Sequence, residues 1–139
     1  MVLAGRGILE GFRTFARERL VSFVMDCLCD RHPMMRGHPF FMGVETGDGW
    51  HDLLDQLCSA LEAEMESSGC SPITVRQVKQ KFGALRFYAS GGNERCRTLI
   101  RQAEALSTSI CDICARPGTL VSRDGWLRAR CSVHEDTRC

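Results

Sequence analysis

The sequence lacks a long uninterrupted apolar stretch. No run among its 139 residues approaches the roughly 20 consecutive apolar residues that a membrane-spanning helix needs, so we expect no membrane segment. The N-terminal residues are amphipathic, and their charges interrupt the apolar core that a secretory signal requires. We therefore expect a cytoplasmic protein. The charged residues in question are Arg6, Glu10, Arg13, Arg17, Glu18 and Arg19.

Internal repeats and low-complexity linkers are absent too. A chain of this length forms one domain, or one domain with a small appendage. The composition, 44% hydrophobic and 25% charged, is that of a globular protein rather than a disordered one. We expect a folded domain over residues 1–109 and an appended metal-binding knuckle over residues 110–139.

Cysteine, in contrast, is abundant. The chain has nine cysteines, an odd number that would leave one thiol unpaired in a framework made only of disulfides. Because we expect no secretory signal, metal ligands and reduced thiols are favoured over disulfide bonds.

Four residues near the C-terminus have the spacing of zinc ligands. Cys111 and Cys114 are separated by two residues, and after sixteen more residues Cys131 and His134 repeat this spacing. Two intervening residues let both ligands of a tight turn reach one ion. The pattern predicts one structural zinc ion per chain, with Cys139 as the alternative to His134 for the fourth ligand.

The segment between the two ligand pairs predicts a β-hairpin. Residues 119–121 and 126–128 flank the turn-forming sequence Arg123-Asp124-Gly125. A ligand pair, a hairpin and a second ligand pair are the layout of a zinc ribbon or of a treble clef. In a treble clef, Cys131 and His134 would lie on the first turn of a closing helix.

Three cysteines and one histidine complete a tetrahedral zinc site. Catalytic zinc normally keeps one position open for water, so this ligand set favours a structural role. The sequence shows no catalytic motif beside it. We therefore expect a protein that is not an enzyme, and a metal-dependent nuclease or hydrolase is the least favoured class.

Periodic patterns predict an α+β fold. Apolar residues at spacings of three and four predict helices over residues 8–28, 50–65 and 94–106, the second capped by Asp48 and the third by Asn93. Residues 73–89 are rich in β-branched and alternating apolar residues, which predicts a β-hairpin that turns near Lys81-Phe82-Gly83. Residues 31–49 are expected to form a loop. The helices should therefore pack against a hairpin.

Charge is distributed unevenly along the chain, although the net charge is only +1. Residues 1–72 carry six basic and eleven acidic residues, whereas residues 73–103 carry seven basic residues and one acidic residue. The basic segment favours an anionic partner. The alternative is that the two segments neutralise each other within the fold. The candidate partner-binding or nucleic-acid-binding residues are Arg76, Lys79, Lys81, Phe82, Arg86, Arg95, Arg97, Arg101 and Trp126.

The remaining histidines suggest no second site. Cys27, Cys29 and His32 could bind a metal, but Cys27 continues an apolar helical stripe and is better explained as a buried thiol. His51 is expected on the surface near the start of a helix. His32 and His38 are expected in a loop, with nothing to orient them.

Two blocks of sequence resemble a known family. They run from Val78 to Tyr88, including KFGALRFY, and from Cys111 to His134, including GWLR. They are similar to a family of small uncharacterised zinc-knuckle proteins found in bacteria, phages and prophages, and the similarity extends from Trp50 to His134. The family has no established activity. The resemblance implies an accessory protein of phages or mobile elements, a class that commonly binds and blocks host complexes as anti-CRISPR proteins do.

These observations lead to one expectation and two alternatives. We expect a non-enzymatic accessory protein that binds a host protein or nucleoprotein complex and inhibits it. The first alternative is a zinc-ribbon protein that binds DNA or RNA directly, and the second is the nuclease or hydrolase. A homodimer formed through the N-terminal helix is a further potential assembly, because that helix is predicted to carry an apolar stripe.

Overall fold

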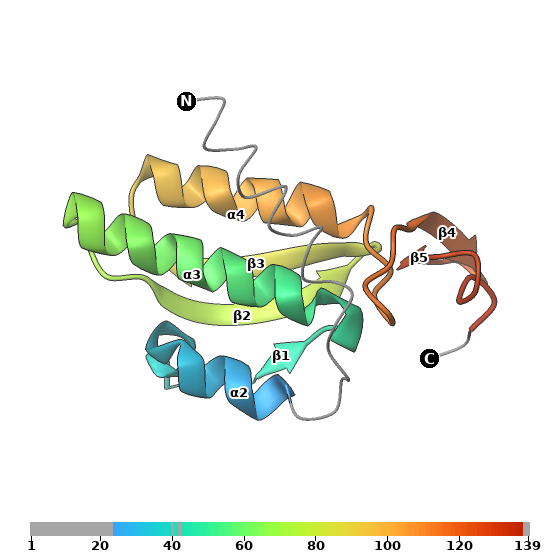
Figure 1. Cartoon of the computed structure of the whole chain (residues 1–139), viewed down its shortest axis with the longest axis horizontal. Coiled ribbons are helices and arrows are strands. Elements are labelled where there is room, and N and C mark those ends of the chain that lie inside the picture. Colours follow the sequence, from blue (N-terminus) through green and yellow to red (C-terminus); the bar gives the residue numbers. More distant parts are fainter. Residues whose placement is uncertain (1–23, 40, 42, 138–139) are drawn as a thin grey trace.

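A computed structural model describes residues 24–39, 41 and 43–137 of the chain (Figure 1). This part is a mixed α+β fold with three α-helices and two β-sheets, which confirms the predicted fold class. Most of the predicted helix over residues 8–28, and the dimer interface predicted on it, lie outside the described residues. Helix α2 (Val24–Arg31) includes its last residues. In the described part, no helix combines the length and hydrophobicity needed to cross a membrane.

The larger sheet contains the predicted hairpin. Strands β2 (Thr74–Lys81) and β3 (Ala84–Ser90) are antiparallel, with Val78 opposite Phe87. Their turn consists of Phe82 and Gly83, whose φ angles of 54° and 75° lie in the left-handed region. A two-residue turn with positive φ at both positions matches the twist of the flanking strands, and glycine adopts this conformation without strain.

A third strand was not predicted. Strand β1 (Val44–Glu45) pairs in parallel with β2, with Val44 opposite Val78. It lies within the segment 31–49, for which a loop was expected, and so do the short 3-10 helices η2 (Pro33–Arg36) and η3 (Asp48–Trp50). The loop prediction was wrong here because two residues are too few to show a strand periodicity.

Two long helices lie side by side on one face of this sheet (Figure 1). Asp48 was predicted to be the N-cap of helix α3 (His51–Ser68). This prediction was wrong, because Asp48 lies in η3 and the N-cap residue is Trp50. Helix α4 (Glu94–Ser107) begins as predicted, because the side chain of Asn93 accepts a hydrogen bond of 3.0 Å from the backbone N–H of Cys96. This bond satisfies one of the donors that every helix start leaves unpaired.

The hydrophobic core lies between the helices and the sheet. Buried side chains of α3, such as Leu57 and Leu61, meet Val78 and Leu85 of the strands. Trp50 is fully buried. Burying one such side chain contributes about 1.5–3 kcal/mol. The core therefore supplies most of the stabilisation of this part of the chain.

The free edge of β3 is covered by side chains of α4. The backbone N–H of Leu85 donates to Oγ of Ser107 over 2.8 Å, and that of Phe87 donates to a carboxylate oxygen of Glu104 over 3.0 Å. Both N–H groups point away from β2 and would otherwise lack a partner in the sheet. Helix α4 thus contributes hydrogen bonds to the strand as well as apolar contacts.

The second sheet is the predicted C-terminal hairpin of β4 (Thr119–Arg123) and β5 (Trp126–Arg130). Hydrogen bonds to backbone carbonyls join its base to the helical part. The N–H of Gly49 donates to the carbonyl of Asp112 over 2.8 Å, and the indole N–H of Trp50 donates to the carbonyl of Ile110 over 2.9 Å. A Cβ at Gly49 would lie 2.1 Å from the carbonyl oxygen of Cys111, so only glycine allows this approach.

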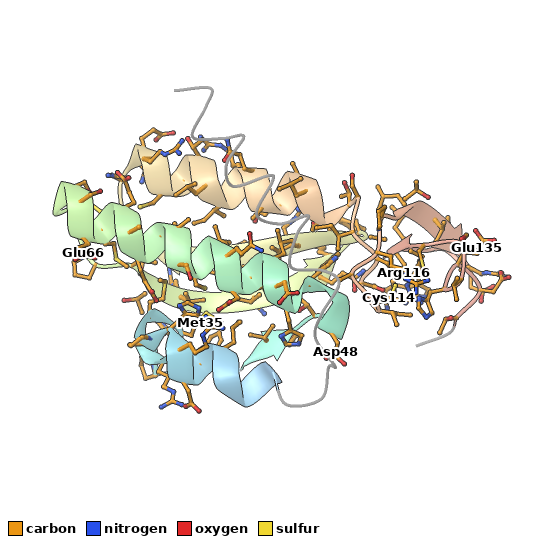
Figure 2. The ribbon with its side chains drawn as sticks, viewed as in Figure 1. Met35, Asp48, Glu66, Cys114, Arg116 and Glu135 are labelled. Carbon is orange, nitrogen blue, oxygen red and sulfur yellow. The ribbon has the colours of Figure 1, made fainter. Side chains whose placement is uncertain are left out.

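Figure 2 shows Cys114 and Glu66 at opposite ends of the molecule.

Candidate functional site

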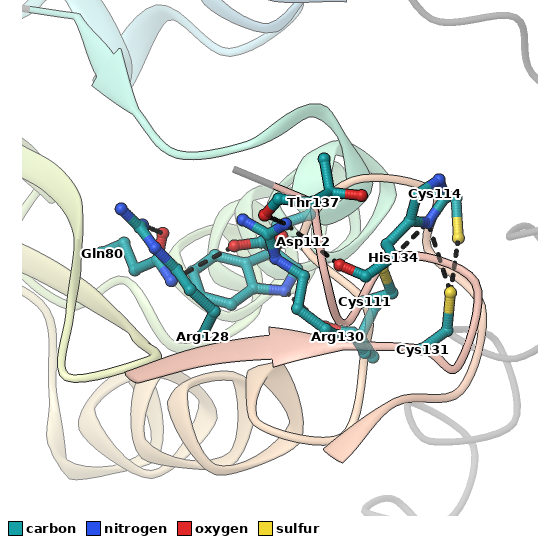
Figure 3. A network of polar contacts seen from close by, with 11 residues as sticks. Gln80, Cys111, Asp112, Cys114, Arg128, Arg130, Cys131, His134 and Thr137 are labelled. Carbon is teal, nitrogen blue, oxygen red and sulfur yellow. Dashed lines mark hydrogen bonds and ion pairs between the residues drawn. The ribbon is translucent and has the colours of Figure 1, made fainter. Parts of the chain in front are cut away.

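The fold brings together the four predicted ligands, Cys111, Cys114, Cys131 and His134 (Figure 3). The first two lie in the turn between α4 and β4, and the last two follow β5. One ligand atom from each residue lies within 4.8 Å of all the others. The four residues could therefore hold one metal ion. Cys139 lies outside the described residues.

The distances within this cluster fit tetrahedral coordination. The sulfur atoms of Cys114 and Cys131 are 3.7 Å apart, and Nδ1 of His134 lies 3.6 Å from the sulfur of Cys111 and 3.3 Å from that of Cys131. A tetrahedron with metal–sulfur bonds of about 2.3 Å has edges of about 3.8 Å. A disulfide would bring two sulfurs to about 2.05 Å, so the cluster has the geometry of a metal site.

Local backbone geometry shapes the first ligand pair. The N–H of Ala115 donates to the carbonyl of Cys111 over 3.0 Å, and the N–H of Cys111 donates to the carbonyl of Arg116 over 2.8 Å. Ala115 has a φ of 66°, in the left-handed region. The chain therefore reverses directly after Cys114. This tight reversal allows two cysteines separated by two residues to point at one centre.

The environment of Cys131 favours its thiolate. Burial acts to raise the pKa of this thiol, but hydrogen bonds involving the backbone of His134 and Val133 and the neighbouring thiols outweigh burial and lower the pKa to about 6. For Cys114, burial and the nearby thiols of Cys131 and Cys111 raise the pKa to about 11. Without a metal ion, the thiolate of Cys131 therefore forms readily, whereas ionisation of Cys114 is unfavourable. A metal ion would remove this opposition and release protons as it binds.

A buried polar network anchors the second ligand pair (Figure 3). Arg130 forms an ion pair with Asp112 at 2.8 Å, and both side chains are almost fully buried. Arg130 also donates to the carbonyls of His134 and Thr137, over 3.4 and 3.0 Å. Burial raises the pKa of Asp112, while the positive charge of Arg130 acts to lower it. Through this network the backbone of His134, a candidate ligand, is joined to the turn that carries Cys111.

This network continues to the larger sheet. The amide of Gln80 donates to the second carboxylate oxygen of Asp112 over 3.3 Å, and Arg128 donates to the amide oxygen of Gln80 over 2.5 Å. Residues from β2, the first ligand turn and β5 are thus joined in one chain of hydrogen bonds. The position of the four candidate ligands is consequently coupled to strand β2.

Two histidines are placed differently from the prediction. His32 is 2% exposed, and its ring nitrogens lie 2.6 Å from a carboxylate oxygen of Glu62 and 2.7 Å from one of Asp55. It is therefore firmly oriented, and neither ring nitrogen is free for a metal shared with Cys29. His51, expected on the surface, is 3% exposed. Sequence reasoning missed both because burial depends on residues distant in the chain.

The predicted cationic residues fall into two groups. Lys79 and Arg86 lie opposite each other on β2 and β3, with Arg76 and Lys81 on the same hairpin. In the part of the chain that the structure describes, none of these four forms an ion pair with a carboxylate. The predicted neutralisation by the acidic segment therefore does not extend to the hairpin within these residues.

The cations of α4 behave differently. Arg97 and Arg101 both pair with Glu94, at 2.9 and 3.0 Å. The resulting hydrogen bonds, that with Arg97 first, lower the pKa of Glu94. Arg95 lies on the same helix. Because α4 belongs to the helical layer, these three residues do not share one surface with the cations of the sheet.

Both hairpins carry large apolar side chains that are exposed. Phe82 at the β2–β3 turn is 69% exposed and Trp126 at the start of β5 is 70% exposed. Leu120 and Leu127, which were not predicted as surface residues, are 46% and 38% exposed. A Cβ at Gly83 would touch the side chain of Leu120, which shows that the β2–β3 turn lies against the β4–β5 hairpin.

Comparisons of the chain with protein-family models, with curated proteins and with solved structures find no match. The resemblance to zinc-knuckle proteins of bacteria and phages therefore stays a prediction. What the chain does must be inferred from its own residues.

Proposed function

We propose that this chain is a non-enzymatic binding protein whose C-terminal hairpin is held by one structural zinc ion. Zinc is supported by the ligand set of three cysteines and one histidine and by ligand distances close to those of a tetrahedral site. The four ligands would fill the coordination sphere and leave no position for a substrate water. Residues 132–136 form turns rather than a helix, which favours a ribbon-like knuckle over a treble clef.

The partner is a protein, and it binds to the hairpin-tip surface, which comprises Phe82, Leu120, Trp126 and Leu127. The observation that carries this proposal is the exposure of these four large apolar side chains on two hairpins that lie against each other at Gly83 and Leu120. Contiguous exposed apolar groups on a soluble domain commonly mark a site of protein interaction. Phenylalanine and tryptophan also bury much area at little cost in conformational entropy, which suits them to the centre of an interface.

The chemistry around this surface also suits an interface. Nζ of Lys81 lies 5.4 Å from the ring centroid of Phe82, so a cation borders the aromatic group. Alternation along β5 places Leu127 on one face of the hairpin and Trp126 on the other. The hairpin therefore presents apolar groups on both faces, and Arg123 and Arg128 on the same two strands provide polar groups beside them. Apolar centres with polar rims are usual in protein–protein interfaces.

The biological setting rests on the resemblance alone. We propose an accessory protein of a phage or mobile element that binds a host protein or nucleoprotein complex. It inhibits this complex by covering a surface that the complex needs for its activity. A defence complex would be one such target, in the manner of anti-CRISPR proteins. This part of the proposal comes by association with a family rather than from the contacts of this chain.

The test is to recover a partner from a bacterial host, purify it, and measure its affinity for variants. Trp126→Ala and Phe82→Ala should each weaken binding by tenfold or more, because aromatic residues at the centre of an interface contribute about 2 kcal/mol or more. Val133→Ala is the matched control, since Val133 is 67% exposed but lies outside the hairpin-tip surface. Equal affinities for all three variants and the unchanged protein would refute the assignment of this surface.

A further inference from the structure

The face of the larger sheet opposite the helices carries polar and cationic side chains. Val78 and Phe87 are paired and buried in the core, so their neighbours Lys79 and Arg86 point to the other face. On the other side of Val78 and Phe87, Gln77 is paired with Tyr88. The pairing is irregular between Val75 and Gln77, and Arg76 at this position is exposed. We call this surface the cationic sheet face; its members are Arg76, Gln77, Lys79, Lys81, Arg86 and Tyr88.

Positive charge on this face is almost unopposed. The three strands contain four cations and a single acidic residue, Glu45, which lies beside Lys79 at the β1 edge. Within the described chain none of the four cations pairs with a carboxylate, whereas six arginines elsewhere do. Ion pairs are thus more common elsewhere in the described chain, where only Arg95, Arg116 and Arg128 form none. The paired arginines are Arg31, Arg36, Arg97, Arg101, Arg123 and Arg130.

An aromatic ring lies among these cations. Tyr88 is 43% exposed, and Nζ of Lys79 lies 5.7 Å from the centroid of its ring. Cations that follow a phosphate backbone, interleaved with aromatic side chains on which bases stack, are the usual components of a site for single-stranded nucleic acid. An acidic protein surface would use the cations but not the stacking surface. In a duplex the base faces are already stacked on one another, so a flat sheet cannot reach them.

We propose that the cationic sheet face binds single-stranded nucleic acid. Phosphates contact Lys79, Arg86 and Arg76, and an unstacked base lies against Tyr88. The site is separate from the hairpin-tip surface, with Phe82 at the border between the two. It therefore adds a second ligand to the protein partner proposed above and does not depend on that partner.

Fluorescence anisotropy with a labelled oligothymidylate of twelve nucleotides tests this proposal on the metal-loaded chain of 139 residues. Three phosphate contacts predict an affinity that falls about 20-fold between 50 and 200 mM salt, since each contact contributes about −0.7 to the logarithmic salt slope. The double variant Lys79→Ala/Arg86→Ala should weaken binding and flatten this slope by about 1.4. Tyr88→Ala should weaken binding about fivefold or more with the slope unchanged, because stacking involves no counterion release.

Two control variants separate this site from general electrostatic attraction. Arg97→Ala/Arg101→Ala removes the same formal charge from the helical layer and should leave the affinity within twofold. Glu45→Gln removes the one acidic group of the face and should tighten binding, a gain that a purely structural role would not produce. Circular dichroism of each variant confirms that the fold is kept.

Three results would overturn the proposal. The first is no binding of the oligonucleotide at 50 mM salt, and the second is an equal loss of affinity in the helical-layer control. The third is tighter binding to a duplex of the same length, or to vesicles of anionic phospholipid, than to the single strand. None of these results bears on the protein partner, whose binding is measured through Trp126 and Phe82.

Discussion

The two hairpins of this protein are alike in secondary structure and unlike in what stabilises them. In β2 and β3, buried and exposed residues alternate, and the buried ones join the core beneath α3 and α4. In β4 and β5, most residues are at least partly exposed, and only Ala129 and Arg130 at the end of β5 are buried. The first hairpin is therefore held by apolar contacts, whereas the second has almost no core of its own.

This difference indicates what the four candidate ligands would contribute if they bind a metal ion. An isolated two-stranded hairpin is marginally stable in water at best. The β4–β5 hairpin is closed at its base by four candidate ligands and by the buried pair of Asp112 and Arg130. Metal coordination and a polar network would thus replace the apolar core that this part of the chain is too short to form.

Removing a ligand should have the largest effect on this comparison. Cys114→Ser should abolish metal binding and unfold the β4–β5 hairpin, because structural zinc contributes about 10–16 kcal/mol of binding energy in zinc-finger peptides. The helical part should stay folded on its own core. Metal analysis and the two indole N–H signals in an NMR spectrum check this, since Trp126 lies in the hairpin and Trp50 in the core.

Cys70→Ser is the control for this experiment. Cys70 is a half-buried thiol outside the cluster, so its variant should keep one zinc ion per chain and both indole signals. A folded, metal-free Cys114→Ser protein with an unchanged Trp126 signal would show that the hairpin needs no metal.

Breaking the buried ion pair should have the next largest effect. Asp112→Ala leaves the guanidinium of Arg130 buried without its partner, which typically costs ~3–5 kcal/mol. The double variant Asp112→Leu/Arg130→Met removes both charges and should lose much less. Urea unfolding of the metal-loaded proteins measures both values. Equal losses in the single and double variants would contradict a role for the unpaired charge.

A pair of leucine substitutions should give the smallest effects and compare the hairpins directly. Leu61→Ala, in the core beneath α3, should lower the free energy of unfolding by about 2–5 kcal/mol. Leu127→Ala, on the partly exposed second hairpin, should lower it by less than about 1 kcal/mol. Urea unfolding again provides the measurement. If Leu127→Ala costs as much as Leu61→Ala, the second hairpin depends on apolar packing after all.

The parts of the structure that sequence predicted well depend on short-range patterns. The β2–β3 hairpin follows from alternating residues around a two-residue turn, and the start of α4 follows from the capping side chain of Asn93. The convergence of the four candidate ligands follows from their paired spacing. Each of these features is encoded within a few residues, so one sequence suffices to recognise it.

The parts that were missed depend on contacts between distant residues. His32 is fixed by Asp55 and Glu62, which are 23 and 30 positions away, and nothing near His32 in the sequence indicates this. Strand β1 is defined only by its pairing with β2. The separation of the basic residues into a sheet group and a helix group likewise appears only when the strands and helices are placed in layers.

The covered edge of β3 limits how this protein can associate. A strand from another molecule could extend the sheet at Leu85 and Phe87 only by displacing Ser107 and Glu104, which already accept the hydrogen bonds of that edge. Strand addition is a common route to fibrils and to domain-swapped assemblies, and covered edges prevent it. At this edge, α4 therefore protects the folded chain against sheet-to-sheet polymerisation, and partners are left to approach through side chains.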